Sequence, residues 1–459
     1  MTKFRSFLLL LAVGALILAA GCQTTDSVVD NQPNESISPL SVTFDTSKVF
    51  SSNLTGFALY DPANDSLIYG HNEDRYFTPA SNTKLFTFYA GLKLLPDSIR
   101  ALEYTVRGDS LIFWGTGDPS FLHSKMGNGK VYKFLKNREE KLYYSDANFA
   151  SKRFGPGWAW DDSNYYYQTE KSPLPMYGNT VSFKIEEIKQ RQIVTTDSGL
   201  AVFPPIFRSY INEVKREHDA PILFRDFSNN NFAYKPEADT NRYTIDKPYH
   251  YTPQLITDML ADTLGKTVTY LPNMEKPDST SIIYSIKADT AYKRMLQPSD
   301  NFIAEQLLLV AAAELGIPLE SRAVIKKMKE EYLNVLPHEP QWVDGSGLSR
   351  YNMFTPRSMI RLLWKIDDEF TKNEQLFHLL PAGGERGTIK DSYIPPQQDS
   401  PYVFAKTGTL SNNHCLSGYL ITESGKKFIF SFMNNHYVTS TSVVEEEMNK
   451  VLRYIYNHF

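Results

Sequence analysis

The sequence predicts an α/β protein in which a domain of sheet and helices is interrupted by a mainly β insertion. Strand-like segments occur near both ends of the chain, and helix-like segments lie between them. Residues 101–245 instead contain short strand-like pieces, many tyrosines and frequent turns, without a long amphipathic helix. At 459 residues, the chain is long enough for more than one domain. We therefore assign residues 46–100 and 246–459 to the split domain and residues 101–245 to an insertion of one or two subdomains.

The first 22 residues have the pattern of an export signal. Two basic residues precede an apolar run, and small residues stand directly before Cys22. The pattern resembles a bacterial lipoprotein signal, in which cleavage leaves Cys22 as the lipidated first residue; an uncleaved apolar anchor is the alternative. The polar residues 23–45 then predict a flexible tether. We expect export to the periplasmic side and a lipid anchor in the outer or the cytoplasmic membrane, with Gln23 after the cysteine favouring the outer one.

The segment after the tether predicts a hairpin that leads into a helix. Residues 56–61 and 66–69 are rich in apolar and aromatic residues, and a Pro-Ala-Asn-Asp turn separates them. Thr78 can cap the following helix, Pro79 suits its first position, and Pro96 ends it. The hairpin therefore delivers the chain directly to the start of this helix.

The remainder of the chain supplies the rest of the split domain. Cap residues and helical spacing predict helices that begin at Thr252-Pro253 and that cover residues 303–315, 321–336 and 355–366. Three strands with turns between them follow, over residues 402–410, 415–421 and 427–433. The chain closes on an amphipathic helix over residues 444–459.

The composition excludes several classes of function. The formal net charge of −4 and the lack of a Lys/Arg-rich run argue against nucleic-acid binding. The nine histidines are scattered, with no His-Glu-x-x-His motif and no cysteine cluster, so we expect no metal site and no cofactor. Cys415 is the only cysteine besides Cys22, and its strand-like surroundings favour a packing role.

The start of the first predicted helix carries a candidate nucleophile. Ser81 lies in its first turn, and Lys84 follows three residues later on the same face. A serine hydroxyl becomes a good nucleophile when a base takes its proton, and a partly desolvated lysine can be that base. The Ser-x-x-Lys pattern is weak by itself, because Ser424 and Lys427 match it too, at a Ser-Gly turn without a helix start.

Two further motifs strengthen this assignment through their order and context. Ser299-Asp300-Asn301 follows a proline at the start of a predicted helix, and Lys406-Thr407-Gly408-Thr409 ends a predicted strand. Each motif has a structural alternative. Ser299 could serve merely as the cap of its helix, and Lys406 could be a solvated lysine at a strand end. Ser411-Asn412-Asn413 also repeats the Ser-x-Asn pattern, in a turn. Chance does not readily supply all three motifs in this order on helix, helix and strand.

The three motifs resemble the signature of the penicillin-recognising serine enzymes. The mature chain is further similar, over essentially its whole length, to the D-alanyl-D-alanine carboxypeptidase/endopeptidase family, the S13 peptidases or class C low-molecular-mass penicillin-binding proteins. The companion segments that carry this likeness are Gly117-Asp118-Pro119, Asp344-Gly345-Ser346-Gly347-Leu348-Ser349-Arg350 and Gly383-Gly384-Glu385-Arg386-Gly387-Thr388. The resemblance implies a transpeptidase-type domain like that of penicillin-binding proteins and serine β-lactamases, with an antiparallel sheet flanked by helices. Ser346 lacks the spacing of a hydrolase elbow, so we interpret its segment as a structural loop beside the cleft.

The resemblance also implies roles for the first two motifs. Ser81 would attack the carbonyl of the penultimate D-alanine in a peptidoglycan stem peptide while Lys84 accepts its proton. D-alanine would leave, and water would then hydrolyse the acyl-enzyme. Ser299 would pass a proton to the leaving nitrogen, and Asn301 would hold Lys84 and the substrate amide. Lys406 would keep Lys84 neutral by like-charge repulsion.

On the same resemblance, the Lys-Thr-Gly strand binds the substrate through Lys406, Thr407, Gly408 and Thr409, with the two threonines on the terminal carboxylate. The backbone N–H groups of Ser81 and Thr409 would form the oxyanion hole, and the loss of one such donor typically raises the barrier by about 3 kcal/mol. β-Lactam antibiotics are the expected acylating inhibitors. The sequence leaves open carboxypeptidase or D,D-endopeptidase action, and the oligomeric state. A β-lactamase-like hydrolase and a catalytically inert peptidoglycan-binding scaffold are the alternatives.

Overall fold

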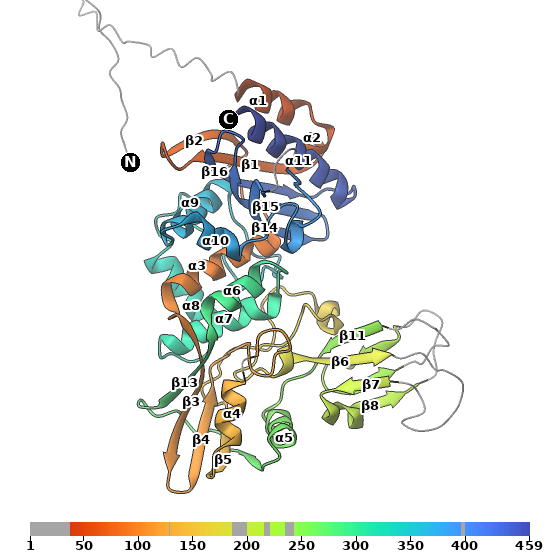
Figure 1. Cartoon of the computed structure of the whole chain (residues 1–459). Coiled ribbons are helices and arrows are strands. Elements are labelled where there is room, and N and C mark those ends of the chain that lie inside the picture. The colour runs from red at the N-terminus through yellow and green to blue at the C-terminus, as the bar shows by residue number, and fades with distance from the viewer. Residues whose placement is uncertain (1–36, 128, 186–199, 215–220, 235–242, 396–399) are drawn as a thin grey trace, which may run out of the picture.

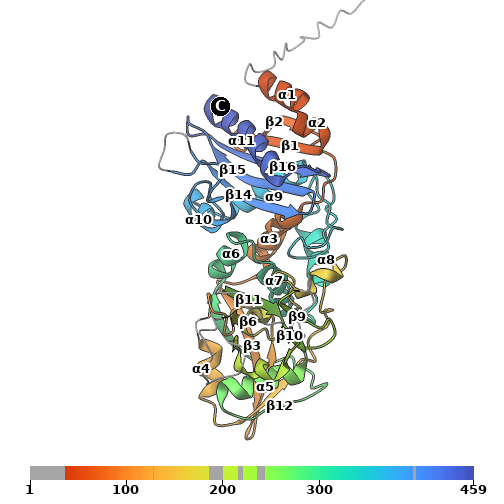
Figure 2. The ribbon, with the colours of Figure 1, turned by 90° about the vertical axis from the view of Figure 1, so that its right-hand side faces the viewer.

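The computed structural model describes residues 37–127, 129–185, 200–214, 221–234, 243–395 and 400–459. The chain forms an upper body of sheet and helices and a lower inserted region, from which a lobe projects to one side (Figure 1). A quarter turn shows the inserted region directly below the upper body (Figure 2). The predicted export signal and Cys22 lie outside the described residues.

The upper body contains a five-stranded antiparallel sheet built from both ends of the chain, in the order β14-β15-β16-β1-β2. Its strands are β1 (Leu54–Asp61), β2 (Ser66–His71), β14 (Val403–Leu410), β15 (Asn413–Ile421) and β16 (Lys427–Asn435). β1 lies against β16 from Leu54 opposite Asn435 to Tyr60 opposite Ile429. The antiparallel sheet flanked by helices, predicted from the sequence, is confirmed.

Successive residues of β1 point to opposite faces of this sheet, and each face carries its own core. Phe57 and Leu59 join a cluster with α11 (Thr441–His458), on the face that α11 and α1 (Ile37–Thr46) cover in Figure 1. Ala58 and Tyr60 join the larger cluster with α3 (Lys84–Leu94) and α9 (Pro356–Asp368). The strands that end at the candidate site are therefore fixed from both sides.

A layer of helices joins the sheet to the inserted region. It contains α6 (Ala288–Leu296), α7 (Asn301–Glu314), α8 (Ser321–Glu331) and α10 (Asn373–Leu379). Helix α7 is apolar around most of its circumference and is buried from Phe302 to Ala313, with α3 on one side and β3 (Ser98–Arg107) of the insertion on another. Its N-terminus, which carries the second motif, is thereby held next to the start of α3.

The inserted region has a five-stranded sheet and a lobe of two smaller sheets. The larger sheet runs β12-β5-β4-β3-β13, with β3 (Ser98–Arg107), β4 (Ser110–Gly115), β5 (Lys141–Ser145), β12 (Val268–Tyr270) and β13 (Ser281–Lys287). Two helices pack on it, α4 (Lys130–Lys136) and α5 (Pro253–Leu264). The lobe contains β11 (Tyr243–Pro248), β6 (Thr180–Ile185) and β7 (Leu200–Phe203), and separately β8 (Ile211–Glu213), β10 (Phe232–Tyr234) and β9 (Leu223–Arg225).

The structure corrects the predicted limits of the insertion, 101–245. The chain enters this region at Ser98 and leaves it at Lys287, because β13 pairs with β3. The helix that starts after Thr252 has its predicted cap, a Leu255 N–H donating to Thr252 Oγ1 at 3.1 Å. Its apolar face nevertheless packs into the core of the insertion and not into that of the upper body. Helical spacing shows that a helix has an apolar face, but not which core receives it.

The predicted tether is also shorter than residues 23–45. Residues from Ile37 onward form α1 (Ile37–Thr46), followed by α2 (Lys48–Ser52). Leu40 and Phe44 are buried against the sheet, with the Phe44 ring 5.1 Å from that of Phe50 and 5.3 Å from that of Phe57. Two apolar residues four positions apart form one face of a helix, and that spacing overrides the polar composition around them.

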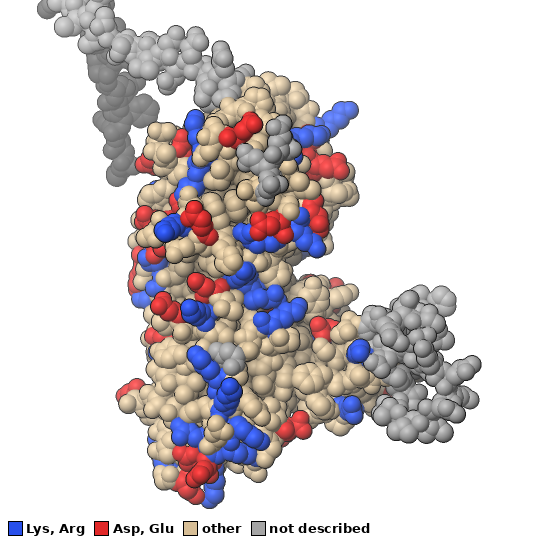
Figure 3. All heavy atoms as spheres, viewed as in Figure 1, with Lys and Arg blue, Asp and Glu red and all other residues tan. Residues whose placement is uncertain are grey.

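The face drawn in Figure 3 carries charged side chains of both signs among the described residues. Acidic and basic side chains are interspersed over the face drawn in Figure 3, in keeping with the small net charge. Within the described ranges, no helix has the length and apolar character needed to span a bilayer. In that part of the chain, no three His, Cys, Asp or Glu side chains gather as metal ligands either.

Candidate active site

Ser81 lies in a 3₁₀ turn, η1 (Ala80–Thr83), that leads directly into α3. The predicted Thr78 cap is wrong, because its side chain makes no capping bond and its N–H donates to Asn435 Oδ1 at 2.7 Å. Ala80 has a left-handed φ of +48°, which costs a non-glycine residue about 1 kcal/mol or more. Thr83 Oγ1 donates to Ala80 O at 2.8 Å and helps to hold this strained turn. Ser81 directly follows this strained residue.

Lys84 is fully buried beside Ser81. Its Nζ lies 2.9 Å from Ser81 Oγ and donates to Asn301 Oδ1 and to Ser346 O, both at 2.6 Å. Burial lowers the pKa of Lys84 to about 8, although the carboxylates of Asp344, Asp300 and Glu305 oppose that shift. A lysine with this pKa is partly neutral near neutral pH, so it can serve as a base for the serine hydroxyl.

A buried loop that follows Trp342 holds the carbonyl that Lys84 contacts. Glu305 on α7 accepts from Ser346 N at 2.8 Å, and Asp344 accepts from Gly347 N at 2.9 Å and Ser349 N at 2.7 Å. Burial, and next the charge of Asp344, raise the pKa of Glu305 to about 7. Ser346 itself is buried and offers Lys84 its backbone oxygen, which agrees with the interpretation of this segment as structural.

The second motif faces both lysines of the site. Asp300 caps α7, accepting from Ile303 N at 3.1 Å, so the side chain of Ser299 is free of that role. Ser299 has a left-handed φ of +63° and accepts from Lys406 Nζ at 2.8 Å. Asn301 holds Lys84 through its oxygen and donates through Nδ2 to the carbonyl of Tyr167 at 2.9 Å. The motif therefore ties the upper body to a loop of the insertion.

Lys406 lies on β14 and is fully buried. It also donates to Thr407 O at 2.7 Å. Burial, and next the charge of Lys84, hold the pKa of Lys406 well below its ordinary value. We expected the repulsion to act mainly on Lys84, but burial is what lowers the pKa of Lys84. A bound anion would offset the burial of Lys406 and favour its charged form.

Gly408 lets β14 approach the nucleophile closely. A Cβ at this position would lie 2.4 Å from Pro79 O and 3.0 Å from Ser81 N, so no larger residue fits without displacing the strand. Thr407 and Thr409 flank this contact on the accessible side of the strand. The third motif is therefore packed directly against the turn that carries Ser81.

Comparison with known protein families shows to which family this chain belongs. The family model described as D-Ala-D-Ala carboxypeptidase 3 (S13) matches residues 42–456. The chain belongs to this family. The family, the fold class and the enzyme class that the sequence predicted, a serine-type D-Ala-D-Ala carboxypeptidase, are thereby confirmed.

Two relatives and one solved structure show how far the likeness extends. The S13 peptidase is 24% identical over 445 residues to D-alanyl-D-alanine carboxypeptidase DacB of Haemophilus influenzae, covering 86% of this chain and 88% of that protein. It is 24% identical over 422 residues to D-alanyl-D-alanine carboxypeptidase of an Actinomadura species, covering 83% and 78%. The crystal structure of penicillin binding protein 4 (dacB) from H. influenzae matches 91% of this chain and 99% of its own, with a TM-score of 0.71 at 21% identity.

Sequence reasoning missed several supporting residues of the S13 peptidase. Glu305 stands four residues after Asn301 on α7. This spacing places both residues on one face of the helix and could have indicated that Glu305 lies at the site. Thr388, which accepts from Thr407 Oγ1 at 2.7 Å, lies in a segment quoted above for its family likeness. His414 gave no signal, because it meets Thr409 Oγ1 at 3.0 Å only through the pairing of β14 with β15.

Proposed function

We propose that Ser81 is the acylated nucleophile of this S13 peptidase, which acts on peptidoglycan stem peptides as a D-Ala-D-Ala carboxypeptidase, a D,D-endopeptidase or both. The observation that supports this most strongly is the 2.9 Å distance between Ser81 Oγ and the buried Nζ of Lys84. Asn301 and the Ser346 carbonyl fix that nitrogen from two other directions. A base held this firmly needs no rearrangement before it takes a proton.

Acylation begins when Ser81 Oγ attacks the carbonyl carbon of the penultimate D-alanine. Lys84, in its neutral form, accepts the hydroxyl proton, and a tetrahedral oxyanion forms. As the C–N bond breaks, Ser299 passes a proton to the leaving nitrogen, with Lys406 at 2.8 Å to replenish it. Free D-alanine or, in a cross-link, the amine of a second stem departs. Lys84 then releases the proton that it took to solvent, and Lys406 regains one from solvent. Water attacks the ester, with neutral Lys84 again as base, and releases the shortened stem.

The third motif positions the substrate for this attack. Thr407, Thr409 and the charge of Lys406 bind the terminal carboxylate, while Asn301 binds the substrate amide. The N–H groups of Ser81 and Thr409 stabilise the oxyanion, and the contact that Gly408 permits keeps the two segments together. β-Lactams acylate the same serine. One structure of penicillin binding protein 4 from H. influenzae, which matches with a TM-score of 0.65, contains a novel β-lactam.

The sequence before the described residues suits an exported enzyme. The proposed signal peptide ends before Cys22, whose lipidation anchors the protein on the periplasmic side of a membrane, the outer one by the sorting preference of Gln23. Residues 23–36 then act as the tether. Mass analysis of the protein purified from membranes tests this, since a diacylglyceryl group on Cys22 is expected and an unmodified Met1 would exclude it.

Peptide turnover tests the proposed function. Residues 23–459 should release D-alanine from a pentapeptide that ends in D-Ala-D-Ala, and Ser81→Ala should release none. Ser424→Ala removes the serine of the other Ser-x-x-Lys match and should keep full activity. Release that persists in Ser81→Ala would exclude Ser81. Turnover of penicillin without peptide cleavage would favour the β-lactamase-like alternative, and neither reaction would favour the inert scaffold.

A further inference from the structure

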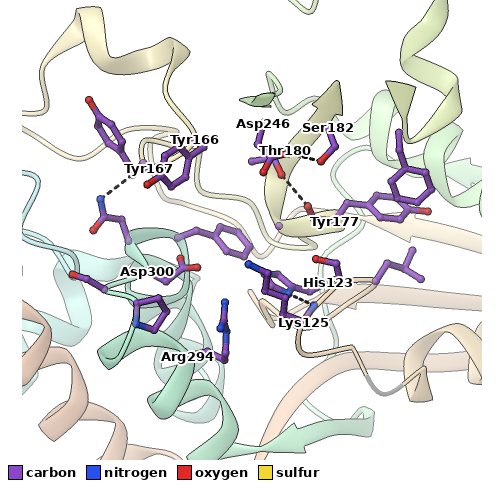
Figure 4. Close-up of a pocket in the computed structure, with 18 residues that line it drawn as sticks. His123, Lys125, Tyr166, Tyr167, Tyr177, Thr180, Ser182, Asp246, Arg294 and Asp300 are labelled. Carbon is purple, nitrogen blue, oxygen red and sulfur yellow. Dashed lines mark hydrogen bonds between the residues drawn. The ribbon is translucent and has the colours of Figure 1, made fainter. Parts of the chain in front are cut away.

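Beside the second motif lies a cavity of about 360 Å³ that the reaction steps above do not use. Ser299 and Asn301 form part of its lining, whereas Ser81 does not. Helices α6 and α7 form one wall in Figure 4, a loop of the insertion forms the opposite wall, and strands of the lobe close a third side. The labelled residues on these walls include Arg294 and Asp300, Tyr166 and Tyr167, and Thr180, Ser182 and Asp246. The cavity is within the usual size range of ligand sites.

Two cations of this cavity have no anionic partner in the described chain. Arg294 projects from α6, and its buried Nε has no hydrogen-bond acceptor among the described residues. Lys125 is exposed, and its side-chain nitrogen likewise meets no acceptor within the described ranges. Lys293, the neighbour of Arg294, is different, because its Nζ lies 2.9 Å from His378 Nε2 outside the cavity. A buried cationic nitrogen without an acceptor is costly, and an anionic ligand would remove that cost.

The acidic residues of the cavity do not serve as acceptors for Arg294 and Lys125. Asp300 uses Oδ1 to cap α7, and Asp246 accepts from Ser182 Oγ. Burial chiefly lowers the pKa of His123; Asp300 raises it, and Arg294 and Lys125 lower it further. Asp300 and both cations therefore all act on His123. The cavity lining holds two carboxylates and two cations, and the carboxylates accept hydrogen bonds from the chain whereas the two cations meet no acceptor among the described residues.

The remaining lining suits a peptide better than a bare ion. Phe302, Phe203 and Tyr177 supply apolar surface, and the ring of His123 lies parallel to that of Phe302 with 6.5 Å between centroids. The hydroxyls of Thr180 and Tyr166 add groups that can bind amides. Apolar walls with a few charged groups are typical of sites that bind organic ligands.

We propose that this cavity is a subsite for a carboxylate of the peptidoglycan peptide other than the one at the scissile D-Ala-D-Ala end. Arg294 is its main partner and Lys125 a weaker one. The inference rests on the proposed function, because the shared Ser299 and Asn301 place the subsite directly beside the bond to be cleaved. The carboxylate belongs either to the stem that acylates Ser81 or to the second stem of a cross-link, and the two sources offer the same chemistry.

Kinetics with three substrates test the subsite and distinguish the two sources. The first is a truncated peptide that ends in D-Ala-D-Ala and carries no other carboxylate, the second a complete monomeric stem, and the third a cross-linked dimer. Arg294→Gln should lower kcat/KM for the acidic substrates relative to the truncated one by about tenfold, the effect of losing one charge-assisted hydrogen bond. Arg294→Lys should restore part of the ratio. Lys293→Gln, on the same helix, should leave it unchanged.

The outcomes separate the subsite from the reaction itself. A lowered ratio for the complete monomer assigns the carboxylate to the acylating stem, and a lowered ratio for the dimer alone assigns it to the second stem. Unchanged ratios in folded Arg294→Gln would overturn the subsite while leaving the peptidase function intact. Should the wild type cleave no substrate, the proposed function fails. Calorimetry of stem binding to Ser81→Ala, about tenfold weaker when Arg294→Gln is added, would then decide the subsite alone.

Discussion

The cationic side chains on the two sides of the α7 N-terminus differ in their burial and in their hydrogen bonds. On one side, Lys84 and Lys406 are fully buried, and each contacts oxygen atoms from at least two segments of the chain. On the other side, Arg294 and Lys125 meet no acceptor among the described residues. The reaction side is thus organised before substrate arrives, as electrostatic catalysis requires. The cavity side leaves two cations without acceptors, as expected of the recognition site proposed above.

The largest expected effect comes from removing the proposed base of the organised side. Lys84→Met keeps most of the side-chain volume but cannot accept the Ser81 proton, so acylation by benzylpenicillin should slow by roughly a thousandfold. Stopped-flow acylation rates measure this directly. Lys93→Met, on the same helix and paired with Glu369 at the surface, is the matched control and should acylate normally. A loss below tenfold in Lys84→Met would show that the base lies elsewhere.

A second variant disturbs the geometry without removing a functional group. Gly408→Ala places a methyl group 2.4 Å from Pro79 O, so β14 must move away from Ser81. A displacement of this size should slow acylation by about a hundredfold. Gly108→Ala provides a control for backbone strain, because Gly108 has φ +60° but nothing within 4 Å of an added Cβ. Equal rates in both variants would mean that the close contact is not needed.

The organised side should also set the pH dependence of acylation. Only neutral Lys84 accepts a proton, so the rate should rise about tenfold per pH unit below its pKa of about 8 and level off above it. Glu305→Gln keeps an acceptor for Ser346 N but removes a carboxylate that raises the Lys84 pKa. The midpoint of the pH–rate curve should therefore move to lower pH. A midpoint that stays or rises would contradict the assigned electrostatics.

The smallest effect concerns salt and separates the two sides. Lys125 is exposed, and exposed charges are screened, so raising ionic strength from about 0.05 to about 0.5 M should lower the preference for acidic over truncated stems by about threefold. The lysines that we propose to act in acylation by benzylpenicillin are buried, so the rate of that reaction should change less. Parallel salt dependence of both reactions would remove the distinction between a buried reaction site and an open recognition site.

The residues of the reaction side could be predicted from the sequence because the proposed chemistry demands particular residue types. A serine needs a nearby base, and Ser81 and Lys84 stand three residues apart at a helix start, a spacing that local structure enforces. Asn301 and Lys406 could be joined to them only because their motifs follow in a recognisable order. Glu305 and His414 carry no such motif, so their contacts became visible only in the folded chain.

The residues of the cavity and the limits of the domains could not be predicted from the sequence, because both depend on long-range packing. Arg294 and Lys125 come from segments far apart in the chain, and neither stands in a motif. Their missing acceptors are a property of the tertiary structure alone. The same holds for α5, whose helix was predicted but whose place in the inserted core was not. Local patterns determine elements, whereas long-range packing determines which surfaces meet.

Intact-protein mass spectrometry of residues 23–459 with benzylpenicillin tests the central claim most directly. The account predicts a single penicilloyl adduct on the wild type, located on Ser81 by peptide mapping, and none on Ser81→Ala. An adduct that persists in Ser81→Ala, or its absence from the folded wild type, would contradict the assignment of Ser81 as the nucleophile.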